Sequence, residues 1–293
     1  MAGSALSEEL LAALQSNSRS HTNLSLSRSK LDDNDALRLS IALASNSCVT
    51  ILDLKSNNIG PEGAERLSTC LIENPTLTHL DLENNILGAD GLQHIASSLR
   101  QNRVLSHLDL ANQWIGQSGV AALAAALETN TALRHLGLAG TSVGEEGADF
   151  LSGLLGTNRA LQHLDLAGNG IGARGAAMLA AGLEVNQSLL HLVLKGNNIG
   201  DSGAEKLSAA WRRNSALKHL SVAYNNITDT GVDALRGAAL SRKAVGATVD
   251  LRGNAPGSKP GADGVEAVLT STAAAPTPVV AGPSSAAAAA AAA

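Results

Sequence analysis

Residues 161–186 read LQHLDLAGNGIGARGAAMLAAGLEVN, and this stretch decides the fold because versions of it return every 28 residues. Aligning the middle leucine of each Leu-x-x-Leu-x-Leu run gives a register that holds without drift. These middle leucines are Leu24, Leu52, Leu80, Leu108, Leu136, Leu164, Leu192 and Leu220. A ninth copy follows one residue late at Val249. A fixed period of this length is the signature of a repeat array, so we predict a solenoid.

Each copy divides into a strand part and a helix part. In the strand part, Leu80 and the leucine two residues later point to one side, while His79 and Asp81 point to the other. In the helix part, Leu67 and Leu71 are one turn apart and share a face. One copy cannot bury these leucines alone, whereas stacked copies bury them against each other. We therefore predict an α/β solenoid, a curved horseshoe with parallel strands on the concave face and helices on the convex face.

Three small or polar positions in each copy have predicted structural roles. Asn57 and its equivalents are expected to satisfy turn backbone groups that stacking would bury unpaired. Gly60 and its equivalents suit a turn with positive φ, and Gly63 lets helix and turn backbones approach closely. Asn74 and its equivalents are predicted to end each helix in the left-handed αL conformation.

The pattern Leu-x-x-Leu-x-Leu-x-x-Asn-x-Ile-Gly, followed by Gly-Ala-x-x-Leu-x-x-x-Leu, resembles the ribonuclease-inhibitor-like class of leucine-rich repeats. The resemblance extends over about residues 20–255. The copies look most like the repeat arrays of NOD-like receptors and, more distantly, those of Ran GTPase-activating proteins. The sequence shows no nucleotide-binding module of the NOD-like receptor kind. The resemblance implies a leucine-rich-repeat solenoid and, for function, a surface that binds another protein.

The two ends depart from the repeat. Residues 1–20 are predicted to form an N-terminal capping helix, because Leu10, Leu14 and Asn17 keep the helix spacing without a strand. Residues 21–272 are expected to form the leucine-rich-repeat domain, closed by a C-terminal capping helix near 262–271. Residues 273–293 are rich in alanine and proline and end in eight alanines, which predicts a disordered tail.

Composition narrows the classes of function. A net charge of −5 argues against a nucleic-acid partner or an anionic membrane surface. No apolar run is long enough to span a bilayer, and the N-terminus lacks the pattern of a secretory signal. Cys48 and Cys70, the only cysteines, fit neither a disulfide framework nor a zinc site. We expect a monomer in the cytoplasm.

Histidines recur at one phase of six successive copies, His79, His107, His135, His163, His191 and His219. Aspartates occupy the next outward position of several copies, at Asp53, Asp81, Asp109 and Asp165. One hypothesis is a metal-binding strip or a pH-dependent contact surface, since imidazoles near carboxylates titrate near neutrality. The interpretation we favour is that His-Leu-Asp-Leu is a common sequence for the strand of this class of repeat, with a structural role only. A flat ladder does not converge on a metal, so no metal or cofactor is predicted.

The aspartates are not expected to be catalytic. They are evenly spaced on an open surface, where nothing should desolvate one carboxyl and raise its pKa. Residues 168–173 match the dinucleotide-binding fingerprint in form, but the repeat already accounts for the asparagine and glycine of that turn. We predict no catalytic residues and therefore no enzyme.

Two aromatic residues stand where other copies have polar or small ones. Trp114 takes the place of Asn58, in the turn after the strand, and Tyr224 takes the place of Gly140. Such substitutions mark candidate binding anchors, although chance drift in a tolerant turn is the alternative. Trp211, at a leucine position of the helix, is predicted to be buried.

The sequence as a whole predicts a non-catalytic scaffold that binds a protein partner on the concave face and the adjoining turns. The candidate binding residues are Trp114, Tyr224, His79, Asp81, His107, Asp109, His135, His163, Asp165, His191 and His219. One alternative is a regulator of a small GTPase, resembling Ran GTPase-activating proteins. Another is an innate-immune-type sensing array resembling NOD-like receptor repeats. The binding prediction follows from the architecture by analogy with other solenoids.

Overall fold

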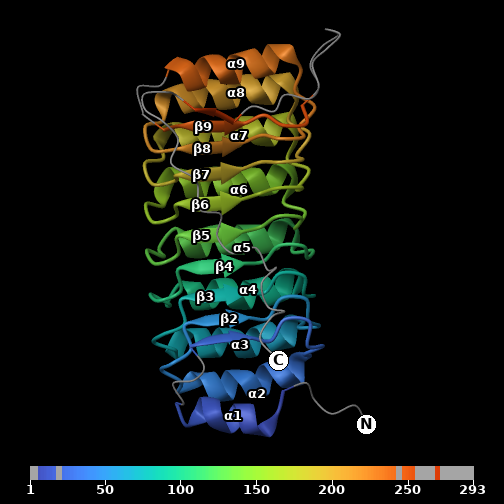
Figure 1. Ribbon diagram of the computed structural model, residues 1–293, viewed down its shortest axis with the longest axis vertical. Coiled ribbons are helices and arrows are strands. Elements are labelled where there is room, and N and C mark those ends of the chain that lie inside the picture. Colours follow the sequence, from blue (N-terminus) through green and yellow to red (C-terminus); the bar gives the residue numbers. More distant parts are fainter. Residues whose placement is uncertain (1–5, 18–21, 242–245, 255–267, 271–293) are drawn as a thin grey trace, which may run out of the picture.

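The computed structural model describes residues 6–17, 22–241, 246–254 and 268–270. Within these residues helices and strands alternate from α1 to β9 (Figure 1). The helices are α1 (Glu8–Gln15), α2 (Asp33–Ala44), α3 (Pro61–Glu73), α4 (Gly88–Leu99), α5 (Gly116–Leu127), α6 (Gly144–Thr157), α7 (Gly172–Val185), α8 (Gly200–Arg213) and α9 (Asp229–Ser241). The strands are β1 (Asn23–Ser25), β2 (Ile51–Asp53), β3 (His79–Asp81), β4 (His107–Asp109), β5 (His135–Gly137), β6 (His163–Asp165), β7 (His191–Val193), β8 (His219–Ser221), β9 (Thr248–Asp250) and β10 (Val268–Thr270).

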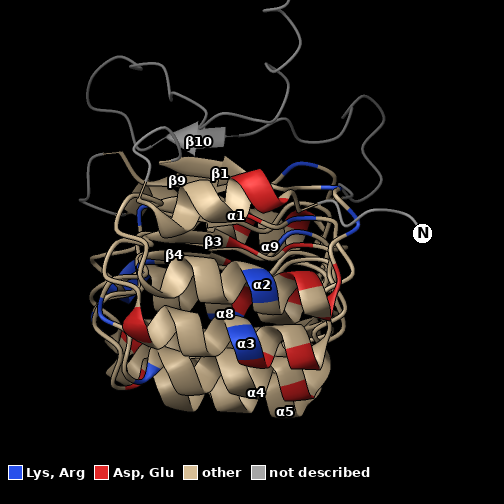
Figure 2. Ribbon diagram, turned by 90° about the horizontal axis from the view of Figure 1, so that it is seen from below, with Lys and Arg blue, Asp and Glu red and all other residues tan. Residues whose placement is uncertain are grey.

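All the strands lie in one sheet in chain order, and β1 to β9 are parallel. Equivalent residues of successive copies are paired, so that Leu80 lies between Leu52 and Leu108. The helices cover one face of the sheet. Viewed along the stack, the middle copies are displaced toward the helix side relative to the terminal copies (Figure 2). The array therefore curves with its strands on the inside, and the predicted solenoid is confirmed.

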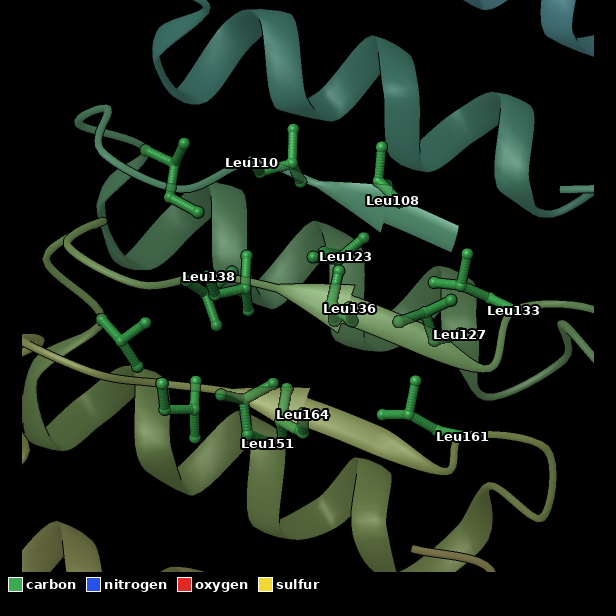
Figure 3. Close-up of a cluster of buried hydrophobic side chains, with 14 of the residues drawn as sticks. Leu108, Leu110, Leu123, Leu127, Leu133, Leu136, Leu138, Leu151, Leu161 and Leu164 are labelled. Atoms are coloured by element: carbon green, nitrogen blue, oxygen red, sulfur yellow. The ribbon is translucent and has the colours of Figure 1, made fainter. Parts of the chain in front are cut away.

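The core is a stack of nearly identical aliphatic layers. In one layer, Leu136 and Leu138 from β5 and the turn after it meet Leu123 and Leu127 from the preceding helix (Figure 3). Each of these four side chains is at most 1 % exposed. Trp211 is fully buried, as predicted, and its indole N–H donates to the Leu217 carbonyl oxygen at 3.2 Å. Repetition of small layers explains how a chain with 1 % aromatic residues builds a continuous core.

The predicted role of the turn asparagines is confirmed. Asn85 is buried, and its side-chain amide donates to the carbonyl oxygens of Leu82 and, in the preceding copy, Leu54, both at 3.0 Å. Its Oδ1 accepts the backbone N–H of Ile59 in that copy at 3.1 Å. One side chain thus pairs groups from two copies. Thr141 replaces this asparagine, and its hydroxyl contacts the Leu138 carbonyl oxygen of its own copy at 2.7 Å and Oδ1 of Asn169 in the next copy at 3.2 Å. Among the described contacts, this hydroxyl makes none to the preceding copy.

The predicted αL conformation at the ends of the repeat helices is wrong. Asn74 has φ −72° and ψ 121°, an extended backbone. The same holds for Asn158, Asn186 and Asn214. The side chain gives the reason, because Oδ1 of Asn74 accepts the Leu77 N–H at 2.7 Å while Nδ2 donates to Leu43 of the preceding copy at 2.8 Å. Asn17, at the end of the first helix, has no earlier copy to bridge to and takes φ 55°.

The glycines at the helix starts follow the prediction with one exception. Equivalent positions such as Gly116 and Gly172 have positive φ, but Gly60 has φ −102°. Pro61 follows Gly60, and a residue before proline favours extended backbone. At Gly63 itself the close neighbours are side chains, since a Cβ there would lie 2.4 Å from Asp33 Oδ1. At the equivalent Gly91 a Cβ would lie 3.2 Å from the Cα of Pro61, so a backbone does approach closely there.

The C-terminal end also differs from the prediction. Instead of a capping helix near 262–271, Val268–Thr270 form β10, which pairs antiparallel with β9. Two of its three residues are β-branched, which favours a strand, and the pairing covers the edge that β9 would otherwise expose. The other residues of the predicted helix, and the predicted tail at 273–293, lie outside the described residues.

Replacing Asn85 with alanine is expected to lower the free energy of unfolding by about 2–3 kcal/mol, because buried backbone groups of two copies lose their partners. Urea unfolding followed by circular dichroism measures this loss. The matched control is Asn84→Gly at the neighbouring exposed asparagine. Asn84 has φ 55° and one side-chain bond, to Ser56 at 3.1 Å, so glycine should change stability by less than about 0.5 kcal/mol. Equal losses for the two variants would contradict the assigned role of Asn85.

Candidate functional site on the concave face

Because successive copies are in register, each outward strand position becomes a column of side chains across the sheet. β3 and β4 pair His79 with His107 and Asp81 with Asp109. The six histidines of the sequence prediction are therefore neighbours in one column on the open face. The aspartate column beside them is interrupted at Gly137, so that Asp109 and Asp165 have a glycine between them. All these histidines and aspartates are half-buried.

The histidine rings stack most closely at the N-terminal end of the column. Ring centroids are 3.8 Å apart for His79 and His107 and 3.9 Å apart for His107 and His135, with interplanar angles of 15° and 12°. The separation grows to 6.0 Å between His191 and His219, where the rings tilt by 39°. The first two spacings are shorter than the ~4.8 Å between strands, so these rings lean onto each other.

Hydrogen bonds hold the first two histidine rings in place. The Thr78 hydroxyl lies 3.0 Å from the Thr50 carbonyl oxygen and 2.8 Å from Nδ1 of His79. Ser106 makes the same pair of contacts, to the Thr78 carbonyl oxygen and to Nδ1 of His107. Each of these carbonyl oxygens also accepts two backbone N–H groups. The proton of either hydroxyl can therefore go to the carbonyl oxygen or to Nδ1, and both neutral tautomers fit the contacts.

Partial burial keeps these rings neutral. Desolvation, reinforced by neighbouring imidazoles, lowers the pKa of His107 and of His163 to about 4. Desolvation also lowers the pKa of His79, His135, His191 and His219. These shifts contradict the hypothesis that carboxylates bring the column to titrate near neutrality, because desolvation is the largest cause of each and a carboxylate contributes only at His219, through Asp250.

The aspartates also depart from expectation. Burial, with repulsion from Asp109, Asp53 and Glu83, raises the pKa of Asp81 to about 6. Desolvation likewise raises the pKa of Asp109 and that of Asp165. The prediction that nothing on this face would raise the pKa of a carboxyl is therefore wrong. Packing side by side on adjacent strands removes water from these groups without a pocket.

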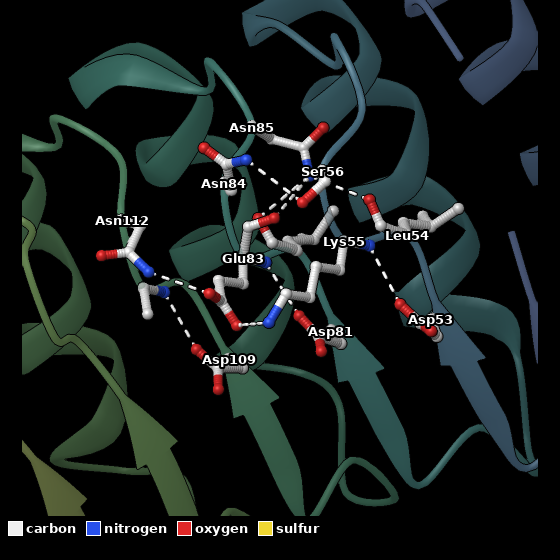
Figure 4. A network of polar contacts seen from close by, with 12 residues as sticks. Asp53, Leu54, Lys55, Ser56, Asp81, Glu83, Asn84, Asn85, Asp109 and Asn112 are labelled. Atoms are coloured by element: carbon white, nitrogen blue, oxygen red, sulfur yellow. Dashed lines mark hydrogen bonds and ion pairs between the residues drawn. The ribbon is translucent and has the colours of Figure 1, made fainter. Parts of the chain in front are cut away.

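A polar network that the sequence prediction missed borders the aspartate column (Figure 4). The Lys55 ammonium forms an ion pair with Glu83, whose other carboxylate oxygen accepts from the Asn112 amide at 2.8 Å. The Lys55 backbone N–H donates to Asp53 at 3.0 Å. Lys55 and Glu83 are 28 residues apart, so the repeat period already predicts that they are neighbours. A comparison of equivalent positions in successive copies is the signal that identifies this pair.

The two aromatic candidates lie on the turns, away from the histidine column. Trp114 is 69 % exposed, and Tyr224 is 56 % exposed. Tyr224 has φ 56°, and the Lys195 ammonium lies 5.1 Å from the centre of its ring. The equivalent residue is glycine in the three preceding copies, and in earlier copies it is a non-glycine residue with the same positive φ, such as Ser56. The structure thus places Trp114 and Tyr224 on the surface but does not bring them together with the histidines.

The convex face carries an open groove of about 700 Å³ between α5, α6 and α7. Small residues line most of it, and Phe150 and Val185, 44 % and 56 % exposed, stand at its sides. Among the described residues, no three His, Cys, Asp or Glu side chains are placed to hold a metal ion. No helix in the same part of the chain is long and apolar enough to cross a membrane.

Comparison with known proteins agrees with the repeat geometry. The family described as Leucine Rich repeat matches residues 45–68, 73–96, 157–180, 185–208 and 213–235. With nine in-register parallel strands among the described residues, these matches define the chain as a leucine-rich-repeat α/β solenoid. The finer resemblance to NOD-like receptor arrays stays a prediction. A search of curated proteins finds no match.

Two solved structures are similar to half of the chain. One is leiomodin-1 actin-binding site 2, with 25 % sequence identity, a TM-score of 0.46, and coverage of 50 % of this chain and 86 % of that one. The other is the tropomodulin C-terminal domain of Caenorhabditis elegans, with 18 % identity, a TM-score of 0.44, and coverage of 50 % and 89 %. At these TM-scores the similarity carries no information about the partner of this chain.

Acidification from about pH 7.5 to 4.5 is expected to destabilise the fold. The pKa of His107 and of His163 is about 4 in the folded state and 6.5 ordinarily, so the unfolded chain takes up these protons first. Stability is then lost as the pH falls from 6.5 towards 4. Asp81 acts in the opposite direction, because its pKa of about 6 exceeds the ordinary 3.8 and the folded state protonates first.

Urea midpoints at the two pH values separate these contributions. His107→Gln should lose less stability on acidification than the wild type, and Asp81→Asn should lose more, because the opposing carboxyl is gone. If His107→Gln lost as much stability as the wild type, the histidine column would not be the source of the acid sensitivity.

Proposed function

We propose that this protein is a non-catalytic scaffold that binds a protein partner on the concave face and the adjoining turns. The observation that carries the proposal is the open strand face itself. Nine parallel strands within the described residues present half-buried polar columns on one side, while helices cover only the other side. Extended concave surfaces of this kind are what solenoids use for binding.

The chemistry of this face favours binding over catalysis. Its carboxylates stand in a column along the sheet, and the first two histidine rings contact the hydroxyls of Thr78 and Ser106 through Nδ1. Catalysis by a carboxyl or an imidazole needs a substrate held against it, usually in a concave pocket. A groove of about 700 Å³ lies on the helix side and is lined mostly by small residues, together with Glu128 and Asp149.

Trp114 and Tyr224 are proposed as aromatic anchors for the same partner. Both are exposed on turns beside the strand face, and large exposed aromatics supply much of the energy of protein interfaces. The positive φ of Tyr224 follows from the repeat geometry, because Ser56 and Asn84 at the equivalent position of other copies have φ of 57° and 55°.

The test replaces both aromatics with residues that other copies carry at the same positions, Trp114→Ser and Tyr224→Gly. Partners captured with the full chain are identified by mass spectrometry, and the dissociation constant of each purified candidate is then measured. The double variant should weaken binding by about tenfold or more without lowering the melting temperature. Leu240→Ser is the matched control, since Leu240 is 72 % exposed on α9, on the helix side. Unchanged affinity in the double variant would remove the aromatic anchors from the proposal.

A further inference from the structure

The groove on the convex face lies where apolar side chains replace charged ones of other copies. Phe150 occupies the repeat position of Arg66 and Lys206, and Val185 occupies that of Arg213. Within α5 there is no charged residue at all. Apolar side chains gathered at a hollow of the surface are typical of an interaction site. The lining comes from about two turns each of α5 and α6 and from the end of α7, within residues 121–128, 149–156 and 181–185.

Two glycines of α6 keep this groove open, although packing does not require them. Among the described residues, a Cβ at Gly153 would meet no neighbouring heavy atom within 4 Å, and one at Gly156 would meet only Val185, at 3.9 Å. Gly182 differs, because a Cβ there would lie 2.5 Å from the Ser152 carbonyl oxygen. Gly153 and Gly156 lie inside the helix without a positive φ, where glycine is less stable than alanine. What the two glycines provide is room in the groove.

Two carboxylates at the groove lack a countercharge. Glu128 of α5 and Asp149 of α6 both line the groove, and both are exposed. Neither of them forms an ion pair within the described part of the chain, whereas Glu184 of α7 pairs with Arg213 at 2.9 Å. The groove therefore combines small apolar residues with unpaired negative charge, and a ligand that fits it is apolar on one side and carries positive charge.

We propose that the groove binds an amphipathic helix of a protein partner, with small or aliphatic residues facing the groove and a lysine or arginine beside them. Neighbouring helices present a groove into which the side chains of a third helix fit, and small residues let the helix axes approach to about 8 Å. The basic residue pairs with Glu128 or Asp149. Because the helices lie on the opposite side of the sheet from the strand face, this is a second binding surface, independent of the concave one.

Charge argues against the two other occupants that the chain itself supplies. A second copy docked through the same groove brings its own Glu128 and Asp149 to a surface that is already negative, and like charges disfavour such a contact. Residues 271–293, which lie outside the described residues, contain no lysine or arginine. Neither occupant neutralises the two carboxylates, whereas a basic helix does.

The test titrates the full chain into three fluorescent peptides and follows their anisotropy. The first is an amphipathic helix of about 18 residues, with alanine and leucine on one face and lysines beside that face. The second has glutamates in place of the lysines, and the third is residues 271–293. The lysine peptide should bind saturably and at least about tenfold more tightly than the other two. No saturable binding of the lysine peptide, or equal or tighter binding of another peptide, would overturn the proposal.

A glutamine placed in the groove locates the site. Gly153→Gln should fill the hollow and weaken binding of the lysine peptide by about tenfold or more. The same change removes a helix glycine, so it should raise the melting temperature by about 2 °C. The matched control is Ala209→Gln, at the same exposed repeat position of α8, and it should leave the affinity unchanged. If the two variants bound the peptide equally well, the groove would not be its site.

Neutral variants and sedimentation complete the test. Glu128→Gln with Asp149→Asn should weaken the lysine peptide by about tenfold. Glu205→Gln with Asp233→Asn, at the repeat position of Asp149 in α8 and α9, should weaken it by less than about twofold. Equal weakening by the two double variants would contradict the assigned role of the groove carboxylates. Self-association of the full chain that Gly153→Gln abolishes would assign the groove to a second copy and reject the partner helix.

Discussion

Asparagine side chains that pair backbone groups of one copy with those of the next are the interaction on which the structure depends. Stacking buries polar groups at both ends of every copy, and each would cost free energy if left unpaired. Asn85 satisfies such groups at the turn after the strand, and Asn74 does so at the end of the helix. An amide is suited to this task because it donates and accepts at once.

This pairing also holds the copies in register, and the register makes the surface. When equivalent residues are paired in register, a residue type that recurs at one repeat position forms a column of side chains across the sheet. The histidine stack, the neighbouring carboxylates and the Lys55–Glu83 pair all arise in this way. The stacking, charge and ion pairing of side chains on the concave face therefore depend on whole columns and not on individual residues.

The period alone was enough to predict the strands, the curvature of the array and the buried leucines, because these depend only on spacing and on the alternation of apolar residues. The αL prediction for Asn74 failed because its conformation follows from a hydrogen bond to Leu43, in another copy. The pKa of Asp81 was missed for a similar reason, since burial by adjacent strands cannot be read from one copy. The strand at Val268–Thr270 was missed because its partner, β9, lies at the end of the array.

Thr141 has a consequence for the mechanics of the array. Among the described contacts, its hydroxyl reaches Leu138 in its own copy and Asn169 in the next, whereas the equivalent asparagines reach back to the copy before. Across this junction the backbone link from Ile115 to the Thr141 carbonyl oxygen is also long, at 3.4 Å. In a linear array, stability is the sum of the copies and of the junctions between neighbours. A junction in mid-array with fewer of these links therefore contributes less to that sum than the junctions on which an asparagine reaches back.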